Sequence, residues 1–260
     1  MSENFVTDAI NIKSYNLSES DKIVVMYSKD KGLIRGVAKG VKKPKSKLGA
    51  RMDMLVANTV MLHKGKNLDT ICQAEALNTF RKTRNDLDKI FYSMYIAEVI
   101  NNFGIEDDPY AQRIYDILYK ALDAISKAET KTEILIAVIK FQFKIMRESG
   151  FSMELDNCLC CHNSIGDESM YLALQSGGVI CQDCMSKIIY PKKQLPYKLR
   201  DFFKNMVQND FDYKGEYETK ATERVCNITF ELLKEYITLK SPKKFKSSAV
   251  LQDLPSVSCV

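Results

Sequence analysis

Tryptophan is absent from this 260-residue sequence, and only two histidines occur, His63 and His162. Histidine is the side chain that most often acts as a general base near neutral pH, so its scarcity leaves few candidates for acid–base catalysis. The motifs GxSxG, HExxH and GxxxxGK[ST] are missing as well. The sequence therefore contains no convincing catalytic set, and we expect a protein that is not an enzyme.

Long hydrophobic runs are also lacking. The longest apolar stretch of the helical region, Ile134–Ile139, is far shorter than the roughly 20 residues of a membrane-spanning helix. Residues 1–10 do not combine a basic region with an apolar run, as a signal peptide would. Hydrophobic residues make up 45% of the chain and charged residues 27%, as in ordinary globular proteins. We therefore expect a cytoplasmic protein with reduced cysteines.

The first 80 residues alternate between short apolar segments and turn-forming residues. Such punctuation predicts strands, and five strands within about 80 residues predict an OB-fold barrel, the common five-stranded barrel that binds oligonucleotides. The five predicted strands are Phe5–Tyr15, Lys22–Tyr27, Gly32–Lys42, Leu55–His63 and Leu68–Leu77.

The remainder of the chain has the three-four apolar spacing of amphipathic helices. One helix carries Leu87 to Val99 and ends before Gly104, and a second carries Ile114 to Leu122. A third is capped by Thr130 or Thr132 and stops at Gly150. The helical period resumes at Lys198–Val207 and Ala221–Leu239. The predicted fold class is α+β, with a barrel at 1–80, a helical domain at 81–260 and a zinc-finger module inserted at 155–190.

Four of the eight cysteines form two CxxC pairs, Cys158 with Cys161 and Cys181 with Cys184, separated by nineteen residues. Each pair turns two thiolates toward one point, and two pairs complete the tetrahedron that zinc prefers. Because four cysteines leave no open coordination position, we predict one structural zinc ion rather than a catalytic one. Cys160 is the odd member, and His162 remains an alternative ligand to Cys161.

Basic residues are concentrated between Lys29 and Arg51, where the only acid is Asp30. As a strand that ends at Pro44, this segment places basic residues on one face and Gly36, Ala38 and Gly40 on the other, which permits close backbone approach in a barrel. A basic strand and loop beside an OB barrel suit a track for phosphates. The predicted DNA contacts are Arg35, Lys39, Lys42, Lys43, Lys45, Lys47 and Arg51.

Aromatic residues for base stacking are sparse in the barrel region: Phe5, Tyr15 and Tyr27. Affinity should therefore come mainly from phosphates, with little sequence preference. The acidic trio Glu106, Asp107 and Asp108 is interpreted as an inter-helix loop and the start of a helix rather than as a metal site.

Several of these stretches together resemble the RecO family of recombination mediators. They are the run GLIRGVAKGVKKPKSKLG at 32–49, Gly65 to Leu68 through Ala74-Glu75, Gly177-Gly178 before Cys181, and LKSPKKFKS at 239–247. The resemblance covers nearly the whole chain. It implies an OB-fold, a zinc finger, binding of single- and double-stranded DNA, and annealing of complementary strands in the bacterial nucleoid. It also implies work with RecR, RecF, single-strand binding protein and RecA, including help in loading recombinase onto coated DNA.

Two other functions remain open at this point. One is an RNA-binding protein built from a barrel and a zinc knuckle, which a competition between single-stranded DNA and RNA would distinguish. The other is a nucleotide-processing enzyme with structural zinc, although the missing catalytic set argues against it.

Overall fold

The chain divides into two units after Lys127, as seen in a computed structural model that describes residues 4–166 and 170–245. The first unit comprises the described residues up to Lys127 together with 242–245, and the second runs from Ala128 to Ser241. The division into domains at residue 80 stays a prediction.

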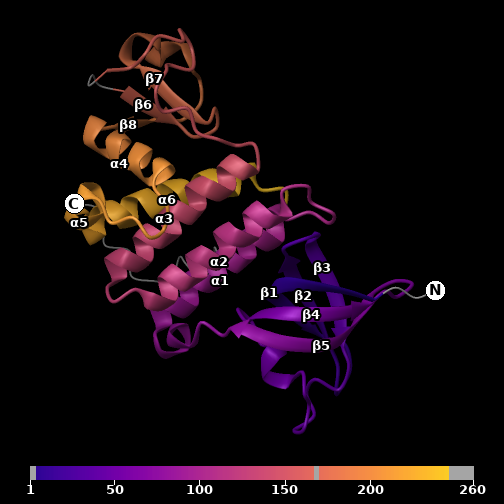
Figure 1. Ribbon diagram of the computed structural model, residues 1–260. Helices are drawn as coiled ribbons and strands as arrows, with labels where there is room; N and C mark the ends of the chain where they lie inside the picture. The colour runs from indigo at the N-terminus through magenta and orange to yellow at the C-terminus, as the bar shows by residue number, and fades with distance from the viewer. Residues whose placement is uncertain (1–3, 167–169, 246–260) are drawn as a thin grey trace. The chain divides into compact units, whose positions relative to one another are not determined.

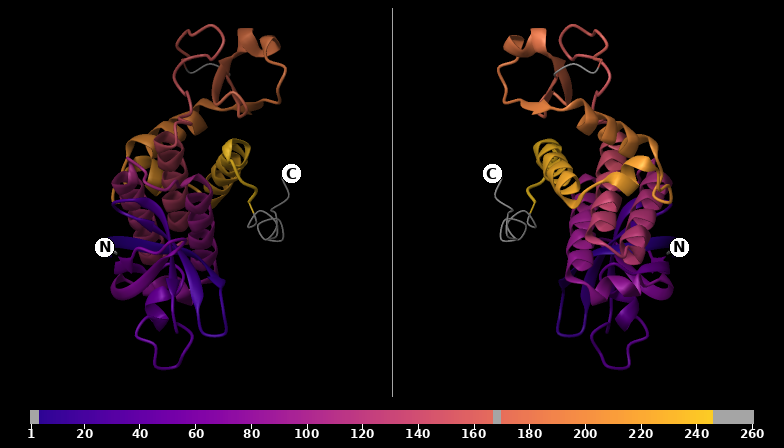
Figure 2. Two further views of the ribbon diagram at one scale, coloured as in Figure 1. Left: turned by 90° about the vertical axis from the view of Figure 1, so that its right-hand side faces the viewer. Right: turned by 90° about the vertical axis from the view of Figure 1, so that its left-hand side faces the viewer.

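Five strands form a closed barrel in the order β1-β2-β3-β5-β4 (Figures 1 and 2). All neighbouring pairs are antiparallel except β3 with β5, which is parallel and closes the barrel. This five-stranded barrel confirms the predicted OB-type fold. The strands are β1 Asn4–Asn16, β2 Lys22–Ser28, β3 Gly32–Ala38, β4 Ala57–His63 and β5 Asp69–Asn78.

The length of β1 lets one strand serve both sides of the barrel. Its first half pairs with β4 and its second half with β2. The register shifts between Asn11 and Lys13, which marks a β-bulge. Because a bulge bends a strand and increases its twist, it turns β1 from one partner to the other and helps the sheet to close.

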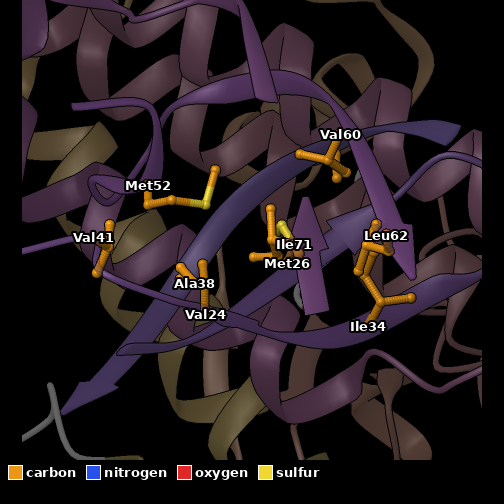
Figure 3. Close-up of a cluster of buried hydrophobic side chains, with 10 residues drawn as sticks. Val24, Met26, Ile34, Ala38, Val41, Met52, Val60, Leu62 and Ile71 are labelled. Carbon is orange, nitrogen blue, oxygen red and sulfur yellow. The ribbon is translucent and has the colours of Figure 1, made fainter. Parts of the chain in front are cut away.

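The barrel is filled by aliphatic side chains and methionines from all five strands (Figure 3). Two members of this core, Val41 and Met52, come from the long β3–β4 connection instead of a strand. Both are almost fully buried. Each fully buried side chain of this size stabilises the fold by roughly 1.5–3 kcal/mol. The connection is thus anchored in the core at two points. The core cluster consists of Ala9, Val24, Met26, Ile34, Ala38, Val41, Met52, Val60, Leu62 and Ile71.

The predicted strand Gly32–Lys42 is too long, because β3 ends at Ala38. Gly40 has a positive φ of 62° and begins a turn, and its amide donates a 2.7 Å hydrogen bond to Asp21 Oδ1. The turn reverses the alternation of side chains, so that Val41 enters the core rather than sharing a face with Arg35. The predicted inner face is confirmed at Gly36, where an added Cβ would lie only 2.7 Å from Ile71 Cγ1.

The described part of the first unit also contains the 3-10 helices Gly49–Met52 and Arg81–Asn85 and two α-helices, α1 Leu87–Phe103 and α2 Ala111–Lys127. Asp86 caps α1 by accepting a hydrogen bond from the Lys89 amide, and Gly104 ends it as predicted. The acidic trio forms the loop between them. There, Asp108 accepts a 2.8 Å hydrogen bond from the Tyr27 hydroxyl and another from the Tyr110 amide. Burial and this carboxylate raise the pKa of Tyr27, which keeps the hydroxyl a donor.

The second unit contains four α-helices among its described residues. The two longest, α3 Lys131–Glu148 and α6 Glu223–Lys240, pack against each other, and α4 Tyr197–Gln208 packs on α3. The short α5, Glu216–Lys220, was not predicted. Thr130, rather than Thr132, caps α3 by accepting from the Glu133 amide. No helix within residues 4–166 and 170–245 is long and apolar enough to cross a membrane.

A small antiparallel sheet lies between α3 and α4 in the chain, in the order β7-β6-β8. Its strands are β6 Met170–Ala173, β7 Gly178–Cys181 and β8 Lys193–Leu195 (Figure 1). The turn between β6 and β7 uses Gly177 with a φ of 78°, a left-handed conformation that glycine adopts without steric cost.

Candidate nucleic-acid interface and metal centre

The basic loop, residues 42–51, connects Val41 and Met52, the two residues that anchor this part of the chain in the barrel core. Its lysines and arginine are all exposed, as is Lys39 in the turn that precedes it. The loop is held at its base by the Lys42 ammonium, which donates a 2.9 Å hydrogen bond to the Ser18 carbonyl of the β1–β2 turn. A cluster of solvated positive charges is thereby fixed at one place on the barrel surface. Its basic residues are Lys42, Lys43, Lys45, Lys47 and Arg51.

A groove of about 530 Å³ lies on the outer face of β1, β4 and β5, beside this loop. Lys47, Leu48 and Arg51 form one wall. The opposite walls come from strand residues, among which Thr59 and Met61 of β4 alternate with the core residues Val60 and Leu62. The groove therefore combines the cations Lys47 and Arg51 with the carboxylate of Glu75 and a floor of polar and apolar side chains. Its other lining residues are Val6, Thr59, Met61, Cys72, Gln73, Ala74 and Glu75.

Two buried asparagines fix the groove wall from inside the protein. Asn11 Nδ2 donates to the carbonyls of Arg51 and Asp53, both at 2.8 Å, and Asn58 Nδ2 donates to the Arg51 carbonyl at 2.9 Å. Both asparagines are fully buried. Since these bonds hold the backbone, they position Arg51 without occupying its guanidinium, which itself donates to the Lys47 carbonyl at 2.7 Å.

Arg35 lies on β3, apart from the basic loop, and is not a free cation. Its guanidinium forms a 3.3 Å ion pair with Glu106 of the acidic loop. The acidic loop is fixed there because the Leu33 amide donates to the Ile105 carbonyl at 2.8 Å. Both charged side chains remain largely exposed, at 47% for Arg35 and 63% for Glu106. A phosphate must therefore compete with a carboxylate for this arginine.

The two CxxC pairs are brought together by the small β6–β8 sheet. Cys181 ends β7 and Cys184 lies in the following turn, the 3-10 helix Gln182–Lys187. Cys158 and Cys161 come from a tight turn in which His162 takes a positive φ of 60° and its amide donates to the Cys158 carbonyl. The four sulfur atoms all lie within 4.8 Å of one another. Cys160 and His162 are not members of this cluster.

The electrostatics of the cluster favour a cation at its centre. Burial opposes a charge on the Cys158 sulfur, but the amides of Cys161, Cys181 and Cys160 outweigh it and lower the pKa of that thiol to about 6. Burial and hydrogen bonds from the neighbouring sulfurs raise the pKa of Cys184 to about 12. Four crowded sulfurs cannot all be thiolates unless a metal ion neutralises them. The cluster can hold one metal ion with four sulfur ligands.

Comparison with known proteins relates the whole chain to one family. The family models described as Recombination protein O N terminal and Recombination protein O C terminal match residues 1–80 and 84–249. The chain belongs to the RecO family.

Three curated relatives are each called DNA repair protein RecO. That of Desulforamulus reducens is 30% identical over 247 residues, which cover 95% of this chain and 93% of the relative. That of Halalkalibacterium halodurans is 27% identical, covering 96% and 95%. That of Rubrobacter xylanophilus is 33% identical over 177 residues, covering 68% and 70%. The stretches that resemble RecO in the sequence are thus part of a similarity along nearly the whole chain. The last two residues of the LKSPKKFKS stretch, 246 and 247, lie outside the described residues.

In this member of the RecO family, the seven predicted DNA-contact residues lie at three different positions on the barrel. Lys47 and Arg51 line the groove. Lys39, Lys42, Lys43 and Lys45 lie on the turn and loop outside it, and Arg35 pairs with the acidic loop. Sequence reasoning missed the groove's strand residues, although alternation in β4 already placed Thr59 and Met61 opposite the core residues Val60 and Leu62. It also missed the pairing of Arg35 with Glu106, because nothing local in either segment indicates it.

Replacing Glu106 by glutamine should free Arg35 and tighten binding of single-stranded DNA. An exposed ion pair is worth about 0.2–1 kcal/mol, so we expect affinity to rise by about 1.5- to 5-fold at low salt. Fluorescence anisotropy of a labelled oligonucleotide measures this. The matched control is Asp107→Asn, which removes the same charge from the same loop and suits the positive φ at that position. Equal effects of the two variants would show that only net charge matters and would contradict a role for the pair.

Proposed function

We propose that this RecO-family chain is a recombination mediator. It binds single- and double-stranded DNA, anneals complementary single strands, and helps to load recombinase onto DNA coated by single-strand binding protein. The residues that carry the binding are the predicted ones: Arg35, Lys39, Lys42, Lys43, Lys45, Lys47 and Arg51. The observation that supports the proposal most strongly is the basic loop, anchored in the barrel core beside a groove into which Lys47 and Arg51 project.

Annealing is possible because such a surface binds phosphates and leaves the base edges of the DNA free to pair. Lysine and arginine side chains neutralise phosphates, and they do not occupy the base edges that pair. When two strands are neutralised together, their mutual repulsion falls while their bases remain able to find each other. The reaction needs no nucleophile and no ATP, and it makes no covalent change in the DNA. The protein is on this view not an enzyme.

We further propose that the ion of the cysteine cluster is a single structural zinc. With a Zn–S distance near 2.3 Å, the edge of a regular tetrahedron of sulfurs is about 3.8 Å. The Sγ atoms of Cys161 and Cys181 lie 3.8 Å apart, which fits that edge. Bound zinc would supply a crosslink between the two CxxC turns. Its four sulfur ligands, Cys158, Cys161, Cys181 and Cys184, would leave no position for water or substrate.

The partners that we propose are RecR, RecF, RecA and single-strand binding protein, in the bacterial cytoplasm and nucleoid. To act on coated strands, the protein needs a surface for the coating protein in addition to its DNA surface. Exposed basic residues of the helical region would receive that protein's acidic tail by charge complementarity.

The proposed mediation can be tested by pairing of coated strands. Complementary oligonucleotides that carry a donor and an acceptor fluorophore are each coated with single-strand binding protein and mixed, without ATP. We expect the RecO chain to accelerate pairing and to leave the length of each strand unchanged on a denaturing gel. A variant with Lys47 and Arg51 both replaced by glutamine should be slower. No acceleration by the wild-type chain over a range of concentrations at low salt would reduce the protein to a generic DNA binder.

A further inference from the structure

Beside the small sheet of the second unit, the segment that runs from the 3-10 helix Gln182–Lys187 to β8 carries an exposed apolar tip. It consists of Met185, Ile189 and Tyr190. Ile189 is 99% exposed and Tyr190 is 55% exposed. The Tyr190 hydroxyl has no hydrogen-bond partner within the part of the chain that the structure describes. Figure 1 labels strands β6, β7 and β8 of this sheet.

The tip is held in a defined shape. The Lys192 ammonium donates to the carbonyls of Met185 at 2.6 Å and Ile188 at 2.7 Å, which closes the segment on itself. On the other side, Met185 directly follows Cys184 of the metal cluster. Because the metal cluster and two hydrogen bonds hold the tip, Ile189 is exposed to solvent in the folded state and is not buried against the protein. Exposing neighbouring apolar side chains in this manner is characteristic of a contact surface.

The charge around the tip indicates a polyanionic partner. Lys187, Lys192 and Lys193 flank it in the sequence, and Asp183 is the nearby acid. Lys193 is paired with Glu235 at 2.6 Å, but Lys187 is exposed and has no ion-pair partner in the described chain. The exposed shape of the tip distinguishes between a nucleic acid and an acidic peptide as the polyanionic partner. A side chain that is almost completely exposed protrudes, so it can enter a gap in a partner but cannot enclose a peptide.

We propose that the apolar tip is a second single-strand contact, in which Tyr190 stacks on an unpaired base and Ile189 wedges beside it while Lys187 meets a phosphate. Aromatic side chains stack on bases irrespective of sequence, and isoleucine is among the residues that insert between bases. This inference rests on the proposed function, since its partner is the same class of DNA. It adds base contacts to a protein whose barrel, with Tyr27 buried, offers few aromatics for stacking.

The double variant Ile189→Ser/Tyr190→Ser tests the tip by affinity. Two probes are used on the full-length, metal-loaded chain: an oligothymidylate of about 40 nucleotides and a blunt duplex of similar length. Stacking needs an unpaired base, so we expect roughly tenfold weaker binding of the single strand and unchanged binding of the duplex. Tyr190→Phe keeps the ring and should bind as wild type. The control with the same two residue types, Tyr213→Ser/Ile228→Ser, removes an exposed tyrosine and an exposed isoleucine elsewhere in the same unit and should also bind as wild type.

Photo-crosslinking gives a second readout that does not depend on the stability of a variant. An oligothymidylate carrying 5-iodouracil crosslinks efficiently to a stacked aromatic ring, and mass spectrometry identifies the peptide. The wild-type chain should yield a crosslink at Tyr190.

Several results would overturn the inference. They are equal losses on single strand and duplex, no loss on either, or crosslinks confined to barrel peptides. Normal DNA binding combined with slow pairing of coated strands would also overturn it and would assign the tip to a protein partner. The proposed function fails separately, when neutralising the basic loop leaves single-strand affinity unchanged.

Discussion

Replacing Cys184 by serine is expected to unfold the β6–β8 sheet and its connecting loops while the barrel stays folded. This sheet has only three strands of three or four residues each, so we expect the metal crosslink to supply much of its stability. Structural zinc contributes roughly 10–16 kcal/mol in isolated finger peptides, and a part of that within a larger fold. Hydrogen exchange measured by mass spectrometry should rise sharply in residues 155–195. Exchange in the barrel strands should not change, because their core lies in the other unit.

Cys160→Ser is the matched control for this prediction. Cys160 lies in the same tight turn as two of the ligands, but its side chain is outside the cluster. This variant should retain one metal ion per chain by elemental analysis and should exchange as wild type, whereas Cys184→Ser should lose the ion. Full metal content and normal exchange in Cys184→Ser would contradict a structural role for the cluster. If elemental analysis finds a metal other than zinc, the cluster is still a metal site, but its ion is not zinc.

Neutralising Lys39, Lys42, Lys43 and Lys45 together, each by glutamine, is expected to weaken binding of single-stranded DNA by on the order of 10²- to 10³-fold near 0.1 M salt. Each neutralised phosphate contributes a slope of about 0.7 to the dependence of log affinity on log salt, which corresponds to roughly fivefold at that concentration. The slope itself should fall by about 0.7 for each phosphate that the variant no longer neutralises. The weakening should be similar for all sequences, because phosphates carry no sequence information.

The control for this variant must carry the same change in net charge. Replacing Lys82, Lys120, Lys220 and Lys244 by glutamine lowers the formal net charge from +5 by the same four units, using exposed lysines that are not part of the basic loop or its preceding turn. This control should bind almost as tightly as wild type and keep most of its slope. Anisotropy titrations at several salt concentrations measure both quantities. If the two variants are weakened equally, binding depends on total charge, and the basic loop is not a specific interface.

Local patterns were sufficient for most of the barrel and for the cysteine cluster. Alternation of apolar and polar residues places Val60 and Leu62 inside and Thr59 and Met61 outside, and the observed β4 follows it. The spacing of the two CxxC pairs predicted which four sulfurs meet. Both are features that a short stretch of chain determines by itself, through strand geometry and the turn that a CxxC pair adopts.

Features that depend on distant residues were not predictable from local patterns. The alternation of the basic segment continues past Ala38, but the hydrogen bond from Gly40 to Asp21 and packing in the barrel core turn Val41 inward. Lys140 is another case. It lies in the middle of α3 and is buried, because its ammonium contacts the Asp210 and Tyr213 carbonyls at 2.8 and 2.9 Å and Glu218 Oε1 at 3.1 Å. Its partners lie on a different part of the chain, which no periodicity identifies.

The most direct test of the central proposal is lysine protection. The RecO chain is treated with an acetylating reagent alone and in complex with single-stranded DNA, and the modified lysines are quantified by mass spectrometry. DNA bound through the barrel should protect Lys39, Lys42, Lys43, Lys45 and Lys47, and should leave Lys82, Lys120 and Lys220 as reactive as before. Unchanged reactivity at residues 39–47, with protection confined to lysines elsewhere, would contradict the proposal that this loop and groove bind the DNA.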